Sequence, residues 1–190
     1  MPTLYIIAGP NGAGKTTAAY NLLPEVFTTV EFVNADEIAK GLSPLNAEGV
    51  AFEAGRIMLR RLDQFINEGK SFAFETTLSG LAYLKFIRQA KAMGFEVVFF
   101  FVHLINHQLA QNRVAFRVSR GGHNIPPDVI ERRYYKGLQN FKAYQELADD
   151  WYVFDNSGTK YVLVAKGVAG EAEIHNFEIY QKLTSDGKGA

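Results

Sequence analysis

The sequence contains no cysteine, no long apolar run and no excess of charge of either sign. Without cysteine the chain cannot form disulfides, use a thiolate nucleophile or bind zinc through thiolates. No apolar run approaches the ~20 residues of a membrane span, and the N-terminus has no basic signal segment. Twenty basic residues balance twenty acidic ones, so no overall field attracts nucleic acid or anionic lipid. We therefore expect a soluble cytoplasmic protein with neither nucleic acid nor a membrane as a partner.

The chain has enough apolar material for one well-buried domain. Its 190 residues are 47% hydrophobic, a length that suits one domain and is short for two. No internal repeat and no linker-like segment interrupts it. We therefore expect residues 1–190 to form a single domain.

Apolar runs alternate with helical patterns along almost the whole chain. Strands are expected near residues 3–8, 30–34, 71–75, 96–103, 151–155 and 160–166. Helices are expected near residues 15–23, 47–68, 80–93, 105–119, 127–149 and 171–183. This order predicts an α/β fold with a central parallel sheet between two helical layers, a three-layer sandwich.

A phosphate-binding loop follows the first expected strand. The pattern G-x-x-x-x-G-K-[ST] is matched by Gly9, Pro10, Asn11, Gly12, Ala13, Gly14, Lys15 and Thr16. Its backbone N–H groups would surround the phosphates of ATP or GTP at a helix N-terminus that continues through Thr17. Lys15 would reach the β- and γ-phosphates, and the Thr16 hydroxyl would bind Mg²⁺. The fold expected from this motif is that of a P-loop NTPase resembling the nucleoside kinases.

Two carboxylates follow the second and third expected strands. Ligands of open parallel sheets bind at the carboxyl ends of strands, so Asp36 and Glu75 would face the loop that carries Lys15. Asp36 could accept the proton of an attacking hydroxyl, or it could cap the following helix. Glu75 could orient metal-bound water or hold the substrate. Thr77 offers a hydroxyl to the substrate, or it too could cap a helix.

Three arginines are spaced four and three residues apart on the helix expected near 105–119. The spacing of Arg113, Arg117 and Arg120 places them on one helical stripe, where a triphosphate would neutralise their repulsion. A flexible turn containing Gly121, Gly122 and His123 follows, and then Arg132 and Arg133. We expect a lid over about residues 105–133 whose guanidinium groups close over the phosphates. A solvated cationic face is the alternative.

With these residues assembled, the chain resembles the zeta-toxin family of P-loop kinases, in particular a small bacterial branch often labelled as predicted ABC-type ATPases. The resemblance extends from the first strand to about Phe141. It rests on four segments, namely residues 9–17, residues 32–36, residues 74–78 and residues 120–126 with 132–134.

The resemblance implies a mechanism and a substrate class. In zeta toxins the counterpart of Asp36 is the catalytic base, and the counterparts of Lys15 and Thr16 bind ATP and Mg²⁺. Two lid arginines hold the phosphates, and they match Arg113 and Arg120 best, with Arg117 as a substitute. The acceptor of those toxins is the 3′-hydroxyl of UDP-N-acetylglucosamine. The resemblance also raises an antitoxin protein as a partner, and the sequence leaves open whether one exists.

Three functions remain after this comparison of motifs, and one of them, a kinase acting on nucleic acid or nucleosides, is supported by the arginines and disfavoured by the zero net charge. Of the other two, the first is a kinase that transfers the γ-phosphoryl group of ATP to a hydroxyl group of a small molecule, such as a nucleotide sugar. The second is a P-loop ATPase or switch that acts through a protein partner. A switch needs an aspartate at a strand end to position water through Mg²⁺, whereas the fourth strand ends in Val102-His103. The sequence therefore favours the kinase.

Overall fold

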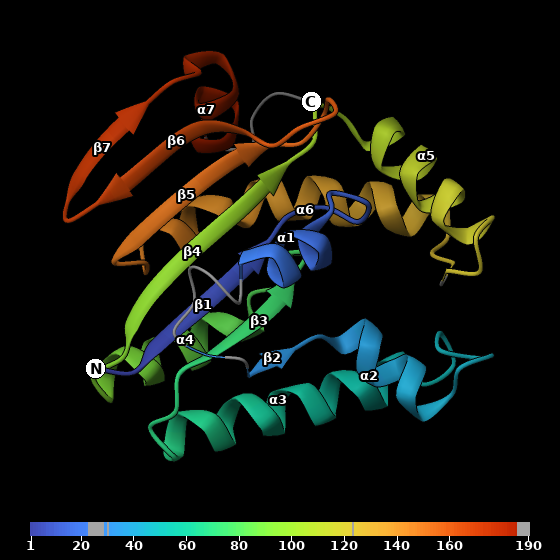
Figure 1. Ribbon diagram of the computed structural model, residues 1–190, viewed down its shortest axis with the longest axis horizontal. Helices are drawn as coiled ribbons and strands as arrows, with labels where there is room; N and C mark the ends of the chain where they lie inside the picture. Colours follow the sequence, from blue (N-terminus) through green and yellow to red (C-terminus); the bar gives the residue numbers. More distant parts are fainter. Residues whose placement is uncertain (23–28, 30, 123, 186–190) are drawn as a thin grey trace.

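The computed structural model describes residues 1–22, 29, 31–122 and 124–185 (Figure 1). A seven-stranded sheet forms its centre, in the order β2-β3-β1-β4-β5-β6-β7. The strands are β1 (Thr3–Ala8), β2 (Phe32–Val33), β3 (Phe72–Thr76), β4 (Glu96–His103), β5 (Asp150–Asp155), β6 (Val162–Val168) and β7 (Glu171–Ile174).

The first five strands of the chain pair in parallel. β1 lies between β3 and β4, and Ala8 pairs with both Thr76 and Phe101. The carboxyl ends of β1, β3 and β4 therefore meet at one edge of the sheet, where ligands bind in open parallel sheets. β6 and β7 add to the far side as antiparallel strands.

Helices cover the two faces of this sheet unequally. They are α1 (Lys15–Leu22), α2 (Ala35–Leu42), α3 (Ala51–Asn67), α4 (Ala82–Ala92), α5 (His107–Val118), α6 (Pro127–Gln145) and α7 (Phe177–Thr184). Buried side chains of α3, α4, α6 and α7 pack against one face, and α1 packs on the opposite face. α5 lies beyond the carboxyl ends of the strands and packs against α6 (Figure 1).

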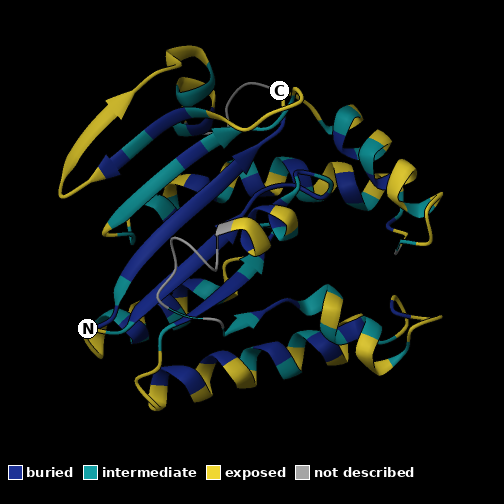
Figure 2. Ribbon diagram, viewed as in Figure 1, coloured by how far each residue is buried: buried dark blue, intermediate teal, exposed yellow. Residues whose placement is uncertain are grey.

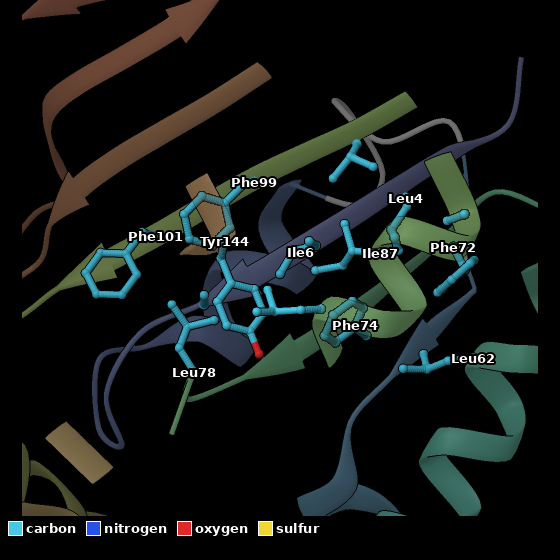
Figure 3. Close-up of a cluster of buried hydrophobic side chains, with 14 of the residues drawn as sticks. Leu4, Ile6, Leu62, Phe72, Phe74, Leu78, Ile87, Phe99, Phe101 and Tyr144 are labelled. Atoms are coloured by element: carbon cyan, nitrogen blue, oxygen red, sulfur yellow. The ribbon is translucent and has the colours of Figure 1, made fainter. Parts of the chain in front are cut away.

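Aromatic side chains dominate the larger core. The central strands are buried along nearly their whole length, as expected for strands covered on both sides (Figure 2). Phe101 packs edge-on against Phe141 of α6, with ring centroids 4.9 Å apart. Phe74, Phe99 and Tyr144 line the same core (Figure 3). Each such ring stabilises the fold by about 1.5–3 kcal/mol relative to exposure, and the core thereby holds the strand ends in register.

The C-terminal part differs from the sequence prediction. The helix expected over 171–183 is in fact β7 followed by α7, because the chain turns back on β6 first. That turn is made by Ala169 and Gly170, whose φ angles of 52° and 83° are both positive, as in hairpin turns. The parallel sheet expected throughout therefore ends at β5.

Other element boundaries shift by a few residues. The helix predicted near 47–68 begins only at Ala51. A separate helix, α2, precedes it, and its bounds were not predicted. The helix predicted to reach residue 149 ends at Gln145. Within the described residues, no helix has the length and apolar character required to cross a membrane.

Candidate active site

The loop after β1 is held tightly against the neighbouring strands. The Gly9 N–H donates to Thr76 O over 3.2 Å, and a Cβ on Gly9 would lie only 2.2 Å from Val102 O. The φ of Gly9 is +144°, a conformation that side chains rarely adopt. Glycine is therefore required where the chain leaves β1, and the loop starts in close contact with the ends of β3 and β4.

Glu75 connects the phosphate-binding loop to the end of β3. Its Oε2 accepts a hydrogen bond of 2.7 Å from the Thr16 hydroxyl. Its Oε1 lies 3.5 Å from Lys15 Nζ, which also donates to Pro10 O over 2.9 Å. The Lys15 side chain is only 5% exposed, so its charge is balanced by a carboxylate rather than by water.

Asn34 places Asp36 at the same edge. Asn34 Oδ1 accepts from the backbone N–H of Asp36 at 2.8 Å and from that of Glu37 at 3.4 Å, which caps α2. Asn34 Nδ2 donates to Glu75 Oε2 over 2.8 Å. Asn34, not Asp36, is thus the helix cap, and Asp36 lines the two hollows described next.

Two adjoining hollows, each of about 200 Å³, meet at these residues. The first hollow follows the phosphate-binding loop and is lined by Gly12, Gly14, Thr16, Thr17, Arg113 and Arg117. The second lies beside β3 and is lined by Asn34, Ala35, Thr76, Thr77, Ser79, Gly80, Tyr83 and Arg133. Both hollows are also lined by Asn11, Lys15, Asp36 and Glu75. A group bound in one hollow would therefore meet a group bound in the other at these four side chains.

The loop after β3 is strained and is held by α6. Leu78 is fully buried with φ +55°, an unfavourable conformation for a bulky residue (Figure 3). Asn140 Nδ2 donates to Leu78 O over 2.7 Å, and Tyr144 OH donates to Gly80 O over 2.6 Å. α6 thereby fixes the wall of the second hollow, where Thr77 Oγ1 and Ser79 Oγ lie 2.9 Å apart.

The predicted arginine stripe divides in the structure. Arg113 and Arg117 line the first hollow. Arg120 stacks over the Phe116 ring at 4.5 Å, because α5 ends at Val118 and the helical spacing no longer applies beyond it. Arg133 of α6 lines the second hollow, whereas Arg132 is exposed. Contact of these arginines with phosphates stays a prediction.

The glycine turn of the predicted lid faces another part of the molecule. Gly121, Gly122 and Asn124 line a hollow of about 350 Å³ together with Lys40 and residues 44–48 of the α2–α3 connection. The lid turn and that connection therefore stand opposite each other. His123, which belongs to the predicted flexible turn, lies outside the described residues.

Residues 156–161, between β5 and β6, also lie at this edge of the sheet. They contact the phosphate-binding loop and Arg113 in ways that the sequence did not indicate. We refer to them as the β5–β6 loop. Asn156 and Tyr161 bond to carbonyls of the phosphate-binding loop, and Arg113 donates to Gly158 O over 3.1 Å. The signal available in the sequence was the polar run Asn156-Ser157-Gly158 directly after a strand.

His103 ends β4 at this edge and is buried, as a core residue would be. Its Nδ1 lies 2.9 Å from Asp155 Oδ1. Burial lowers the pKa of His103, and the hydrogen bond to Asp155 opposes that shift only in part. His103 is therefore a neutral tie between β4 and β5 near neutral pH.

The residues around Thr16 fit a magnesium ion. Because the Thr16 hydroxyl donates its proton to Glu75, the lone pairs of its oxygen stay available to a metal ion, and Thr16 lines the first hollow. Mg²⁺ binds few protein oxygens and keeps waters and phosphate oxygens as its other ligands. Asn11 Oδ1 is buried without a hydrogen-bond partner among the described residues, and Asn11 lines both hollows. A hydroxyl or a metal-bound water would satisfy that oxygen.

Comparisons with known sequences identify a family and several relatives of the chain. The family model described as Zeta toxin matches residues 1–166. An uncharacterized protein of Haemophilus influenzae is 29% identical over 126 residues, which cover 66% of this chain and 88% of that protein. A cytidylate kinase of Saccharolobus islandicus is 25% identical over 161 residues, which cover 80% of this chain and 79% of the kinase.

Solved structures share the fold. A chain of the AvrRxo1-ORF1:AvrRxo1-ORF2 crystal structure with sulphate ions has a TM-score of 0.80 at 19% identity, covering 100% of this chain and 65% of its own length. A chain from the PezAT chromosomal toxin-antitoxin system of Streptococcus pneumoniae has a TM-score of 0.67 at 15% identity. The match covers 96% of this chain and 78% of the PezAT chain. This chain thus spans about two thirds of the length of the AvrRxo1 chain. The predicted P-loop kinase fold is confirmed.

Proposed function

The chain belongs to the zeta-toxin family of P-loop kinases, and from this premise we propose that it transfers the γ-phosphoryl group of ATP to a hydroxyl group of a small molecule. The observation that carries the proposal is the set of four side chains shared by the two hollows. A kinase needs a donor site and an acceptor site that meet at a cation and a base. Lys15 and Asp36 provide these at the junction.

The donor side is the first hollow. Gly9 to Thr17 would bind the phosphates through backbone N–H groups at the start of α1, and Lys15 would neutralise charge on the β- and γ-phosphates. Lys15 would then exchange part of its interaction with Glu75 for phosphate. Mg²⁺, held through Thr16 and waters near Glu75, would supply charge neutralisation on the phosphate oxygens.

Asp36 is the proposed base. The acceptor hydroxyl would bind beside the Asp36 carboxylate and give it its proton while the hydroxyl oxygen bonds to the γ-phosphorus. The bond between the γ-phosphorus and its bridging oxygen breaks, and ADP leaves with that oxygen. Asn34 supports this role because it caps α2 itself and fixes the Asp36 backbone.

The acceptor side is the second hollow. Glu75, Thr77 and Ser79 offer hydrogen bonds to a polyhydroxyl compound, and Arg133 offers a positive charge. A volume of about 200 Å³ suits a sugar ring rather than a whole nucleotide sugar, so the remainder would extend outside. UDP-N-acetylglucosamine is the proposed first candidate, by analogy with the zeta toxins.

Protein partners follow the same analogy. The PezAT neighbour comes from a toxin-antitoxin system, and the AvrRxo1 neighbour was crystallised as a complex of two proteins. We extend to this chain the proposal that an antitoxin protein binds it.

A screen for phosphorylated products tests the function. ATP and Mg²⁺ are incubated with the protein and with UDP-N-acetylglucosamine, nucleosides or cytidine monophosphate, and products are identified by mass spectrometry and ³¹P NMR. A phosphate ester on a hydroxyl carbon is the expected product. Conversion of cytidine monophosphate to the diphosphate, the reaction of the cytidylate kinase relative, would mean that the acceptor is a phosphate and would overturn the proposal.

A further inference from the structure

Two side chains of the β5–β6 loop hold the phosphate-binding loop from its outer side. Asn156 Nδ2 donates to Ala13 O over 2.8 Å, and Tyr161 OH donates to Gly14 O over 2.9 Å. The bonded residues are 143 and 147 positions apart in the sequence. The β5–β6 loop thereby joins the last turn of the phosphate-binding loop to the far half of the sheet.

These contacts orient amide groups of the phosphate-binding loop. In a trans peptide unit the carbonyl and the N–H point in opposite directions. The Ala13 carbonyl shares its unit with the Gly14 N–H, and the Gly14 carbonyl shares its unit with the Lys15 N–H. Drawing the carbonyls towards the β5–β6 loop turns both N–H groups away from it, and Gly14 and Lys15 line the first hollow.

The Ala13 carbonyl depends more on its contact with Asn156 than the Gly14 carbonyl depends on its contact with Tyr161. Gly14 O also accepts the first helical bond of α1, from the Ala18 N–H at 2.9 Å, so its direction is already partly set. Within the described part of the chain, the Ala13 carbonyl has no such helical bond, and Asn156 donates to it. Loss of the Asn156 side chain should therefore disturb the loop more than loss of the Tyr161 hydroxyl.

The geometry leaves room only for glycine between the two contacts. A Cβ on Gly14 would lie 2.6 Å from Tyr161 OH and 2.9 Å from Asn156 Nδ2, and the φ of Gly14 is +87°. Glycine at this position therefore permits the approach of the β5–β6 loop as well as the turn around the phosphates.

The β5–β6 loop is itself anchored. Ser157 Oγ donates to Asp155 Oδ1 over 2.6 Å and accepts from the Ile105 N–H at 2.8 Å. The carbonyls of Ser157 and Gly158 accept from the Arg113 guanidinium at 3.4 and 3.1 Å. One short loop thus fixes both the amide groups and an arginine of the first hollow.

We propose that Asn156 and Tyr161 are positioning residues for the donor phosphates, acting through the Gly14 and Lys15 amides without touching the nucleotide. The inference rests on the proposed function insofar as a nucleotide binds at Gly9 to Thr17. It goes further by assigning phosphate affinity to residues outside the loop motif and outside the lid.

The test compares two ligands by calorimetry in the presence of Mg²⁺, ATP and inorganic tripolyphosphate, which has no base or sugar. Asn156→Ala should weaken binding of both ligands about fivefold to tenfold, and Tyr161→Phe about twofold to fivefold, as expected for single hydrogen bonds. Tyr152→Phe in the middle of β5 is the matched control and should bind as the wild type does. Unfolding temperatures without ligand show whether each variant is folded.

The outcomes separate the possible roles. Equal loss for ATP and tripolyphosphate in folded variants supports the inference. Loss for ATP with unchanged tripolyphosphate binding would assign both residues to the base or ribose and overturn it, as would wild-type affinity of both variants for both ligands. A wild-type protein that binds neither ligand would overturn the proposed function and this inference with it.

Discussion

Two different replacements of Asn34 separate the two contributions of this buried side chain to stability, the cap of α2 and the hydrogen bond to Glu75. Asn34 is 6% exposed, its Oδ1 caps α2, and its Nδ2 donates to Glu75. Asn34→Ala removes both contributions. Asn34→Ser keeps a good capping oxygen and removes only the bond to Glu75.

The magnitudes follow from the two contacts. Loss of an N-cap costs about 1 kcal/mol, and loss of a hydrogen bond to a charged group costs about 2 kcal/mol. Asn34→Ala should therefore lower the free energy of unfolding by about 3 kcal/mol and Asn34→Ser by about 2 kcal/mol. For a chain of this size these values correspond to about 9 °C and about 6 °C in the unfolding temperature.

Guanidinium chloride unfolding followed by circular dichroism measures both values. Asn106→Ser is the matched control, since the Asn106 side chain caps α5 through the same kind of bond, to Leu109 N–H. It should change the free energy of unfolding by only a few tenths of a kcal/mol. If Asn34→Ser were as stable as this control, the bond to Glu75 would contribute nothing and the assignment of Asn34 would be wrong.

Three further predictions concern the lid, the core and pH. Hydrogen exchange over residues 113–133 should slow when a non-hydrolysable ATP analogue binds, and Arg117→Ala, at an arginine that lines the first hollow, should lower turnover more than nucleotide affinity; equal protection with and without the analogue would exclude a lid. Gly137→Ala should destabilise the protein by about 1–3 kcal/mol in thermal unfolding, since the new Cβ would lie 2.6 Å from Thr77 O; unchanged stability would mean that the strained loop is not held by α6. Because burial lowers the pKa of His103, the unfolded chain binds its proton first as pH falls below about 6.5, so stability should decrease there. His103→Gln should flatten this dependence in urea titrations, and an unaltered slope would contradict it.

The sequence was sufficient to predict that the phosphate-binding loop, Asp36 and Glu75 lie together at one edge of the sheet. The loop pattern, the strand before it and the two strand-terminal carboxylates are local features, and parallel pairing brings strand ends together whatever the details of packing. The P-loop kinase fold and the family followed from them and are confirmed. The roles of the site residues, from Lys15, Thr16 and Asp36 to the acceptor side and the lid arginines, remain predictions.

Features that depend on distant partners could not be predicted in the same way. Asn34 belongs to the segment 32–36, but its hydrogen bond to Glu75 forms only because β2 pairs with β3, which the local sequence does not show. The contacts of Asn156 and Tyr161 require the register of β4 with β5 and the bulged pairing of β5 with β6. Arg120 shares the helical spacing of Arg113 and Arg117, but one helix end at Val118 removes it from their stripe.

Single-turnover transfer of the labelled γ-phosphoryl group of ATP to the acceptor found in the screen tests the central claim, that Asp36 is the base at the junction of the two hollows. The account predicts that Lys15→Ala abolishes transfer. It predicts that Asp36→Asn binds ATP with wild-type affinity but transfers the group about 10²–10⁴-fold more slowly. Transfer by Asp36→Asn at the wild-type rate would contradict the claim and leave Glu75 as the remaining carboxylate shared by both hollows.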